Sequence, residues 1–201
     1  MKIINLINLS KSYRNPVINN ISYSFIKGKT YLLVGENGSG KTTLIKLIMG
    51  FISPTSGKIE KLTKSISYVP DNLSFPDFLN VNEFLINLGN IYGLNNISDE
   101  ITDLANDWEL DCSLKLSELS KGMRQKVLII QAFLKAGDVY IFDEPLNGLD
   151  KKMQELLSKK IKVLKNEGKT IIIISHQINI FSSLIDVILE IKDGKLYERV
   201  N

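Results

Sequence analysis

The chain has 201 residues, 44% of them hydrophobic, which suits one domain, or one domain with an insertion, around a sizeable core. Its 25 basic and 22 acidic residues leave a net charge of +3, too mild and too dispersed to indicate a nucleic-acid partner, and none is expected. The single cysteine, Cys112, excludes an internal disulfide, and the sequence has no His/Cys cluster for a metal, so we expect a reducing compartment and a thiol in the core. The chain begins without a secretory signal and has no apolar run near the roughly 18 residues of a membrane span, which predicts a soluble protein.

Two antiparallel strands are predicted at the start of the chain. Residues 2–9 and 18–26 are rich in apolar side chains, and the turn-like sequence Arg14-Asn15-Pro16 separates them. Tyr13 lies at this turn. A single tyrosine here is more often an ordinary surface or core aromatic, although one beside a nucleotide can stack on the base. On its own, Tyr13 does not distinguish the two.

A glycine-rich loop follows a strand predicted over residues 30–34. Residues 35–42, GENGSGKT, fit the phosphate-loop pattern, and residues 43–49 predict a helix that ends at Gly50. Between a strand and a helix, such a loop turns its N–H groups around phosphate oxygens, and the helix N-terminus adds partial positive charge. Lys41 would reach the terminal phosphates and Thr42 would bind the Mg²⁺ that bridges them. The alternative, an ordinary glycine-rich turn with a solvated lysine, is disfavoured by this context.

The middle of the chain changes character. Residues 54–57 predict a turn, and 58–60 and 65–69 predict short strands that end at Pro70-Asp71. From 72 to about 136 the spacing of apolar residues becomes helical, with helices expected at 81–91, 101–108 and 122–134. This predicts a helical insertion. Within it, Ser120 is placed to cap the next helix, and a plain helix cap is the favoured interpretation of that stretch taken alone.

Two carboxylates follow the next predicted strand, residues 139–142. Buried charge is costly unless it is paired or bound to a cation, so Asp143 and Glu144 at the end of an apolar strand suggest a metal and general-base pair. Asp143 is the candidate metal partner, through water, and Glu144 is the candidate base for an attacking water. A strand that simply emerges into solvent is the alternative, and it weakens once a phosphate loop is present.

The last third of the chain predicts a helix, a strand and a hairpin. Asp150 precedes an amphipathic helix that Gly168 ends, and residues 170–174 predict a strand. That strand leads to His176, the chain's only histidine, which in a parallel sheet would share an edge with the phosphate loop and the two acids. A single histidine is more often structural or solvated. Residues 187–192 and 195–200 predict a hairpin, and we find no internal repeat.

Taken in this order, the segments resemble the ATPase domain of the ATP-binding cassette (ABC) family, and the resemblance covers essentially the whole chain. Residues 119–123 resemble the signature motif, 139–144 the second nucleotide motif, and 147–150 the loop after it. The resemblance implies an α/β fold, a P-loop NTPase core with a mostly parallel sheet. It also implies an N-terminal antiparallel β subdomain and an inserted helical subdomain at about 72–136, within one ABC ATPase domain over 1–201.

By the same resemblance, the cofactors are ATP and Mg²⁺. Tyr13 matches the aromatic that stacks on adenine, and His176 matches the switch histidine at the γ-phosphate. The implied catalytic residues are Glu144 and His176, and the implied metal ligands are Thr42, Asp71 and Asp143. The implied ATP-binding residues are Tyr13, Gly35, Glu36, Asn37, Gly38, Ser39, Gly40, Lys41, Thr42, Thr43, Ser120 and Gly122.

The sequence departs from the family pattern near the site. Lys121 and Met123 stand where glycine and glutamine are usual, but Ser120 and Gly122 are retained, so we expect function to survive. Asp71 stands where the family has glutamine. An aspartate can still bind magnesium, but when ionised it donates no hydrogen bond and adds negative charge near the γ-phosphate. We therefore expect a different rate or coupling.

The family geometry implies an ATP-dependent dimer, because the signature of one copy covers the phosphate loop of another. The chain has all five of the residues that a competent site needs, which favours a homodimer: Lys41, Ser120, Asp143, Glu144 and His176. The chain is expected to be the ATP-hydrolysing subunit that drives a separate integral membrane subunit, in the cytoplasm at the inner face of the cell membrane. Residues 73–79 supply apolar side chains where the family docks that partner, with internal packing as the alternative. The short chain favours an exporter by analogy.

Two other functions compete with this one. A soluble ABC ATPase acting on a macromolecular partner such as the ribosome or DNA would carry two cassettes or long coiled coils, and neither is seen. An unrelated phosphate-loop kinase or GTPase does not explain the signature, the Asp-Glu pair and the histidine together.

Overall fold

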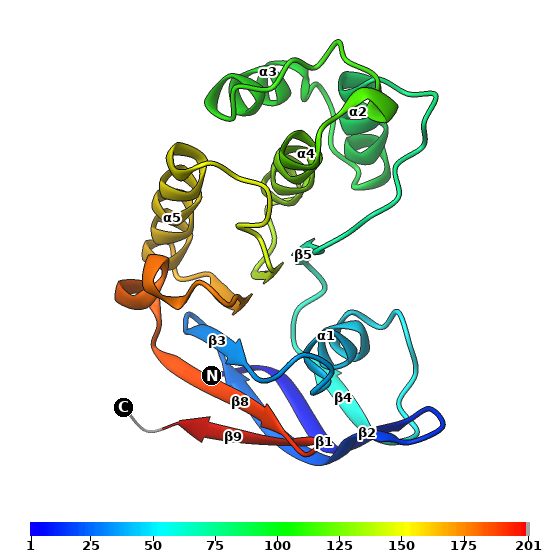
Figure 1. The fold of residues 1–201 in the computed structure, drawn as a ribbon, viewed down its shortest axis with the longest axis vertical. Coiled ribbons are helices and arrows are strands. Elements are labelled where there is room, and N and C mark those ends of the chain that lie inside the picture. The colour runs from blue at the N-terminus through cyan, green and yellow to red at the C-terminus, as the bar shows by residue number, and fades with distance from the viewer. Residues whose placement is uncertain (200–201) are drawn as a thin grey trace.

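The structure, a computed structural model, describes residues 1–199 and contains two β-sheets with helices packed against them (Figure 1). One sheet has the strand order β2-β1-β4 and the other has the order β5-β6-β7-β3-β8-β9. The strands are β1 (Lys2–Ser12), β2 (Pro16–Ile26), β3 (Thr30–Val34), β4 (Ser56–Lys61), β5 (Ile66–Val69), β6 (Val139–Asp143), β7 (Thr170–Ile174), β8 (Val187–Lys192) and β9 (Lys195–Arg199). The helices are α1 (Lys41–Met49), α2 (Val81–Ile91), α3 (Ser98–Asp107), α4 (Lys121–Leu134) and α5 (Lys151–Asn166), with short 3₁₀ turns η1 (Leu116–Glu118), η2 (Ile178–Ile180) and η3 (Ser182–Leu184).

The first sheet is antiparallel, as the sequence predicts. β1 pairs with β2 along its whole length, from Lys2 opposite Ile26 to Ser12 opposite Pro16, and β4 adds on its other edge. Both strands extend beyond the predicted ranges toward Tyr13, because main-chain pairing continues after the apolar residues end.

The second sheet is parallel except for β9, and both of its faces are buried. Side chains alternate along each strand, so Leu32, Ile171 and Ile173 pack on the side of α4 and α5, while Ile172 and Ile174 pack on the side of α1 and the antiparallel sheet. This double burial explains the run of four isoleucines in β7, none of them more than 1% exposed. The predicted α/β fold with an additional antiparallel sheet is confirmed.

Helices α2, α3 and α4 all lie between β5 and β6 in the sequence and gather together at one end of the molecule (Figure 1). They pack around Trp108, which is fully buried. α2 begins at the predicted residue because the residues around its start cap it. The Asn80 side chain accepts from the Glu83 N–H at 2.8 Å, and Glu83 returns a bond to the Asn80 N–H at 3.0 Å. Cys112 is half-buried against this core.

The carboxyl ends of β3, β5, β6 and β7 meet at one edge of the parallel sheet, which places the chemically distinctive residues together. β8 and β9 form the predicted hairpin, and Val200 of the expected second strand lies outside the described residues. Across residues 1–199, no helix combines the length and the apolar composition needed to cross a membrane.

Candidate functional site

The glycine-rich loop joins β3 to α1 in a conformation that only glycine allows at two positions. Gly35 and Gly40 have φ of 150° and 107°, and a Cβ on Gly35 would lie 2.6 Å from both the Ile191 carbonyl oxygen and the Ser39 Oγ. α1 begins directly after Gly40, with no side-chain cap and no acidic residue in its first turn. Its first N–H groups are therefore available to an anion at the positive end of the helix dipole.

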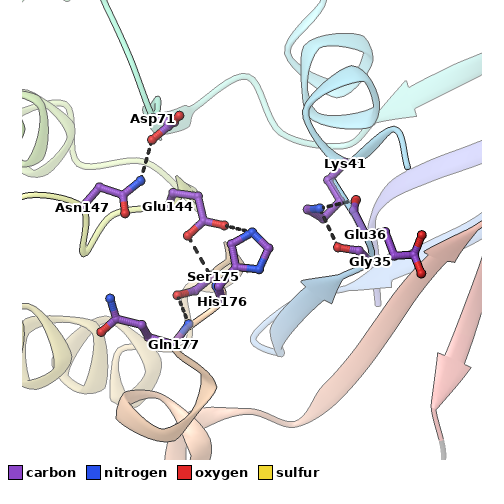
Figure 2. A network of polar contacts seen from close by, with 9 residues as sticks. All are labelled: Gly35, Glu36, Lys41, Asp71, Glu144, Asn147, Ser175, His176 and Gln177. Carbon is purple, nitrogen blue, oxygen red and sulfur yellow. Dashed lines mark hydrogen bonds and ion pairs between the residues drawn. The ribbon is translucent and has the colours of Figure 1, made fainter. Parts of the chain in front are cut away.

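Lys41 lies folded against its own loop. Its Nζ donates to the carbonyl oxygens of Gly35 and Glu36, at 2.7 and 2.9 Å (Figure 2). The side chain lines a cavity of about 420 Å³ at the edge of the parallel sheet. Two carbonyl oxygens thus hold the Lys41 ammonium group beside the phosphate loop. A bound phosphate would offer it charged oxygens in their place.

The same cavity brings together residues that follow four strands of the parallel sheet. The glycine-rich loop follows β3, Asp71 follows β5, Asp143 ends β6 with Glu144 after it, and His176 follows β7. The remaining expected residues that line this cavity are Asn37, Gly38, Gly40, Lys41, Thr42 and Thr43. The shared edge predicted from the sequence therefore exists, and it is hollow enough for a phosphate chain.

The surroundings of Asp143 disfavour the ionised form of its carboxylate. It is only 3% exposed, and burial, followed by the charges of Asp71 and Glu144, raises its pKa to about 6. The nearby hydroxyls of Thr42 and Tyr68 partly offset this rise in pKa. An excess of buried negative charge beside a threonine hydroxyl fits a divalent cation, which supplies the missing positive charge.

The protein alone does not form a complete cage for a metal. Within residues 1–199, no three His, Cys, Asp or Glu side chains cluster closely enough to hold an ion together. Mg²⁺ is usually bound by one or two carboxylates together with substrate phosphates and waters. The three expected ligands, Thr42, Asp71 and Asp143, all line the cavity.

Glu144 faces His176 across the cavity. Its Oε1 lies 3.2 Å from the His176 Nε2, and its Oε2 accepts from the His176 N–H at 3.4 Å (Figure 2). Burial raises the pKa of Glu144, and the charges of His176 and Lys41 act against that rise. The residue has φ of 49°, a left-handed conformation that costs energy for a side chain other than glycine, and its N–H is tied to the Ile174 carbonyl at 2.9 Å. The carboxylate is therefore aimed by a fixed, strained backbone.

Asn147 is a site residue whose contact sequence reasoning missed. Its Nδ2 donates to the Asp71 Oδ1 at 2.7 Å, which joins the loop after β5 to the loop before α5 (Figure 2). The motif at 147–150 marks the loop, but the two partners are 76 positions apart and only the folded sheet brings them together.

A second cavity of about 430 Å³ adjoins the other side of the glycine-rich loop. Glu36 and Ser39 line it, together with residues of the β8–β9 hairpin. Tyr13 lines neither cavity in the described chain. Its ring is 60% exposed, with the Lys11 Nζ 5.2 Å from the ring centre.

Ser120 and Gly122 also do not line the cavities on either side of the loop. Ser120 is exposed and caps α4, accepting from the Met123 N–H at 3.3 Å. Gly122 packs against the loop after β6, where a Cβ would lie only 2.4 Å from the Gly148 carbonyl oxygen. In a single copy, these two residues contribute a helix cap and a close backbone contact.

A phosphate loop between strand and helix, with a lysine, two carboxylates and a histidine at the same edge of a parallel sheet, defines a nucleotide-hydrolysing P-loop protein. The model of the ABC transporter family matches residues 18–147. The ABC transporter ATP-binding protein YybJ of Bacillus subtilis, itself uncharacterised, is 36% identical over 96% of this chain and 94% of its own. The zinc import ATP-binding protein ZnuC of Rickettsia bellii is 34% identical over 88% of this chain and 77% of its own.

Solved structures agree with the sequence relatives. The structure of an ATP-binding subunit of an ABC transporter superimposes with a TM-score of 0.90 at 26% identity, covering 98% of this chain and 90% of the other. The chain belongs to the ABC transporter family, as one of its ATP-hydrolysing subunits.

Proposed function

We propose that two copies of this chain close on two MgATP molecules and that this movement drives a separate membrane subunit. One observation carries the proposal: Lys41, Asp143, Glu144 and His176 share a cavity, while Ser120 is exposed elsewhere on the chain. We further propose that residues 72–136 form a helical subdomain, carrying the signature, inside a single ATPase domain.

On ATP binding, Lys41 exchanges its loop carbonyls for the terminal phosphates, and the N–H groups of the loop and α1 surround the phosphate oxygens. Thr42, Asp143 and Asp71 would hold Mg²⁺, which would supply positive charge against the negative charge of the phosphates. The raised pKa of Asp143 reflects the charge that such a cation offsets. Tyr13, exposed at the turn between β1 and β2, is proposed to stack on the adenine.

Glu144 acts as the general base. It orients a water for in-line attack on the γ-phosphate and accepts its proton as the bond to the bridging oxygen breaks, giving ADP and phosphate. The His176 Nε2 lies against the Glu144 carboxylate, and His176 is proposed to turn toward the γ-phosphate when ATP is bound. The strained backbone at Glu144 keeps the base in place without help from the substrate.

The second copy completes each site. Ser120 and the amide of Gly122 begin α4, so they offer a hydroxyl and the positive end of a helix dipole to the γ-phosphate of a facing copy. Because one chain carries Lys41, Asp143, Glu144 and His176 as well as Ser120, we propose a homodimer with two equivalent sites.

The dimer is tested with Glu144→Gln, which should bind MgATP, hydrolyse it far more slowly and accumulate a dimer on size exclusion. Ser120→Arg added to that variant should abolish the dimer while ATP binding to the monomer is kept. Ser98→Arg, at the exposed start of α3, is the matched control and should leave the dimer intact. A dimer that persists with Ser120→Arg would overturn the composite site.

The membrane partner is proposed to bind an apolar groove of about 550 Å³ between α1, β5, α2 and α4. Phe51 and Leu73 line it and are 61% and 44% exposed. Only part of the predicted docking stretch, residues 73–79, lines this groove. Leu73 does, whereas Phe75 is buried against Phe84 with ring centres 5.2 Å apart. Lys46 and Lys135 also line the groove, so its complement is a helix with one apolar face and flanking carboxylates.

This partner would place the chain at the cytoplasmic face of the membrane. Phe51→Asp should lower the fraction of the chain that sediments with membranes when the chain is expressed in its own cells, while Val163→Asp, on an exposed position of α5 outside the groove, should not. Equal sedimentation of the two variants would favour the soluble alternative.

Export remains a prediction, since the ZnuC relative is named for import. Cargo uptake into inside-out vesicles measures the direction of transport.

A further inference from the structure

Tyr68 lies between the apolar groove and the metal-binding edge of the sheet. In the parallel pair of β5 and β6 it is opposite Ile141, two residues before Asp143. Because side chains alternate along a strand, Tyr68, Ile141 and Asp143 share the face of the sheet that α1 covers. α1 also carries Thr42, the other proposed metal ligand, at its start.

The two ends of the Tyr68 side chain meet different environments. Its hydroxyl lies near the Asp143 carboxylate, which the register of β5 and β6 brings to the same face of the sheet. Its ring lines the groove and packs against Phe51, with ring centres 5.9 Å apart at an interplanar angle of 54°. One rigid side chain therefore touches both the carboxylate and the surface proposed for the partner.

The backbone of Tyr68 is held from the helical side of the groove as well. Its carbonyl oxygen accepts from the Gln131 Nε2 at 2.6 Å, and the Gln131 Oε1 in turn accepts from the Tyr92 hydroxyl at 3.0 Å. Gln131 and Tyr92 both line the groove. Residues of the groove thus contact Tyr68 both at its ring and at its main chain.

We propose that Tyr68 is a positioning residue that orients the Asp143 carboxylate toward the divalent cation and makes this orientation depend on packing in the groove. A carboxylate has four lone-pair positions, so one oxygen accepts from Tyr68 while the other remains free for a cation or its water. A phenol ring transmits displacement because it is planar and stiff, unlike the flexible lysines beside it. The inference rests on the proposed role of Asp143 in binding Mg²⁺.

The test measures Mn²⁺ binding as a substitute for Mg²⁺, from the electron paramagnetic resonance signal of free Mn²⁺. The full-length chain is saturated with the non-hydrolysable ATP analogue adenylyl imidodiphosphate, so that turnover plays no part. Tyr68→Phe removes only the hydroxyl and should weaken Mn²⁺ binding roughly tenfold, as expected for the loss of a group that orients a metal ligand. Phe51→Ala should give a smaller loss in the same direction.

The double variant distinguishes a linked pair from two independent effects. If Phe51 acts through the Tyr68 hydroxyl, Phe51→Ala should add nothing to Tyr68→Phe. Phe78→Ala, an aromatic that is 79% exposed and outside the groove, is the matched control and should leave Mn²⁺ affinity unchanged. Full affinity in Tyr68→Phe would overturn the positioning role, and additive losses in the double variant would overturn the link to the groove.

Asp143→Asn separates this inference from the proposed function. If that variant keeps full Mn²⁺ affinity, the metal role of Asp143 fails and the role of Tyr68 fails with it. If Asp143→Asn loses affinity while Tyr68→Phe does not, only the inference about Tyr68 is overturned. Tyr68→Phe keeps the ring that fills the sheet face, and thermal unfolding of each variant checks the fold.

Discussion

Replacing Asp143 with asparagine should make the nucleotide-free chain more stable while removing a proposed metal ligand. Burial and two neighbouring carboxylates raise the pKa of Asp143 from 3.8 to about 6, so the folded state holds this carboxyl in an unfavourable charged form at neutral pH. A difference of about two pKa units corresponds to up to about 3 kcal/mol at pH 7.5. Asparagine has nearly the same shape and carries no charge, so it removes that cost.

The pH dependence gives the prediction its sign. A carboxyl whose pKa is higher in the folded state binds more protons there than in the unfolded chain, so its cost is present above pH 6 and disappears as the pH falls toward 3.8. The advantage of Asp143→Asn should therefore be largest at pH 7.5 and should fall to about half at pH 5.

Urea unfolding of the nucleotide-free chain in EDTA measures this effect. Asp77→Asn, which removes an exposed carboxylate outside the cavity, is the control and should change the free energy of unfolding by less than about 0.5 kcal/mol. A variant Asp143→Asn that is no more stable than wild type at pH 7.5, or equally stabilised at both pH values, would show that the charge at Asp143 is already compensated within the chain.

Two further predictions concern the ends of the cavity. Lys41→Ala should lower ATP affinity by at least about tenfold with an unchanged circular dichroism spectrum, because a charge-assisted contact to the phosphates is lost; retained affinity would remove Lys41 from the site. Asp71→Gln should raise the Mg²⁺ concentration needed for half-maximal ATPase rate and should keep or raise the maximal rate, because it removes a charged ligand and a repulsion with the γ-phosphate. Superimposable Mg²⁺ titrations of wild type and this variant would mean that Asp71 is no ligand and only holds Asn147.

The parts of the fold that the sequence predicts are those with local signals. The loop at 35–42 is specified by its glycines and its lysine, and α2 has the predicted bounds because Asn80 and Glu83 form a reciprocal cap within four residues. α3 begins at Ser98, three residues before the predicted start, because polar residues of its first turn lie outside the apolar pattern. Strands β6 and β7 follow from their uninterrupted apolar runs, which double burial requires.

The contacts that the sequence could not predict join residues far apart along the chain. Tyr68 and Asp143 belong to neighbouring strands separated by three helices, so their contact depends on the order of strands in the sheet. Asn147 and Asp71 meet because two loops end at the same edge. The groove likewise exists only where α1 and β5 face α2 and α4. Spacing rules describe one element at a time and contain none of this information.

The energetics of the chain are consistent with a site that one copy leaves incomplete. Asp143 is buried with uncompensated charge, and Glu144 is held in a left-handed conformation, each of which costs folding energy. MgATP would offset the first cost, and a facing Ser120 would add a hydroxyl donor to those that already line the cavity. Since ligands stabilise the state that binds them, the proposed dimer would gain the stability that these two residues cost the single chain, and hydrolysis would withdraw it. A site that carries such a cost is therefore suited to the proposed conversion of ATP binding into movement.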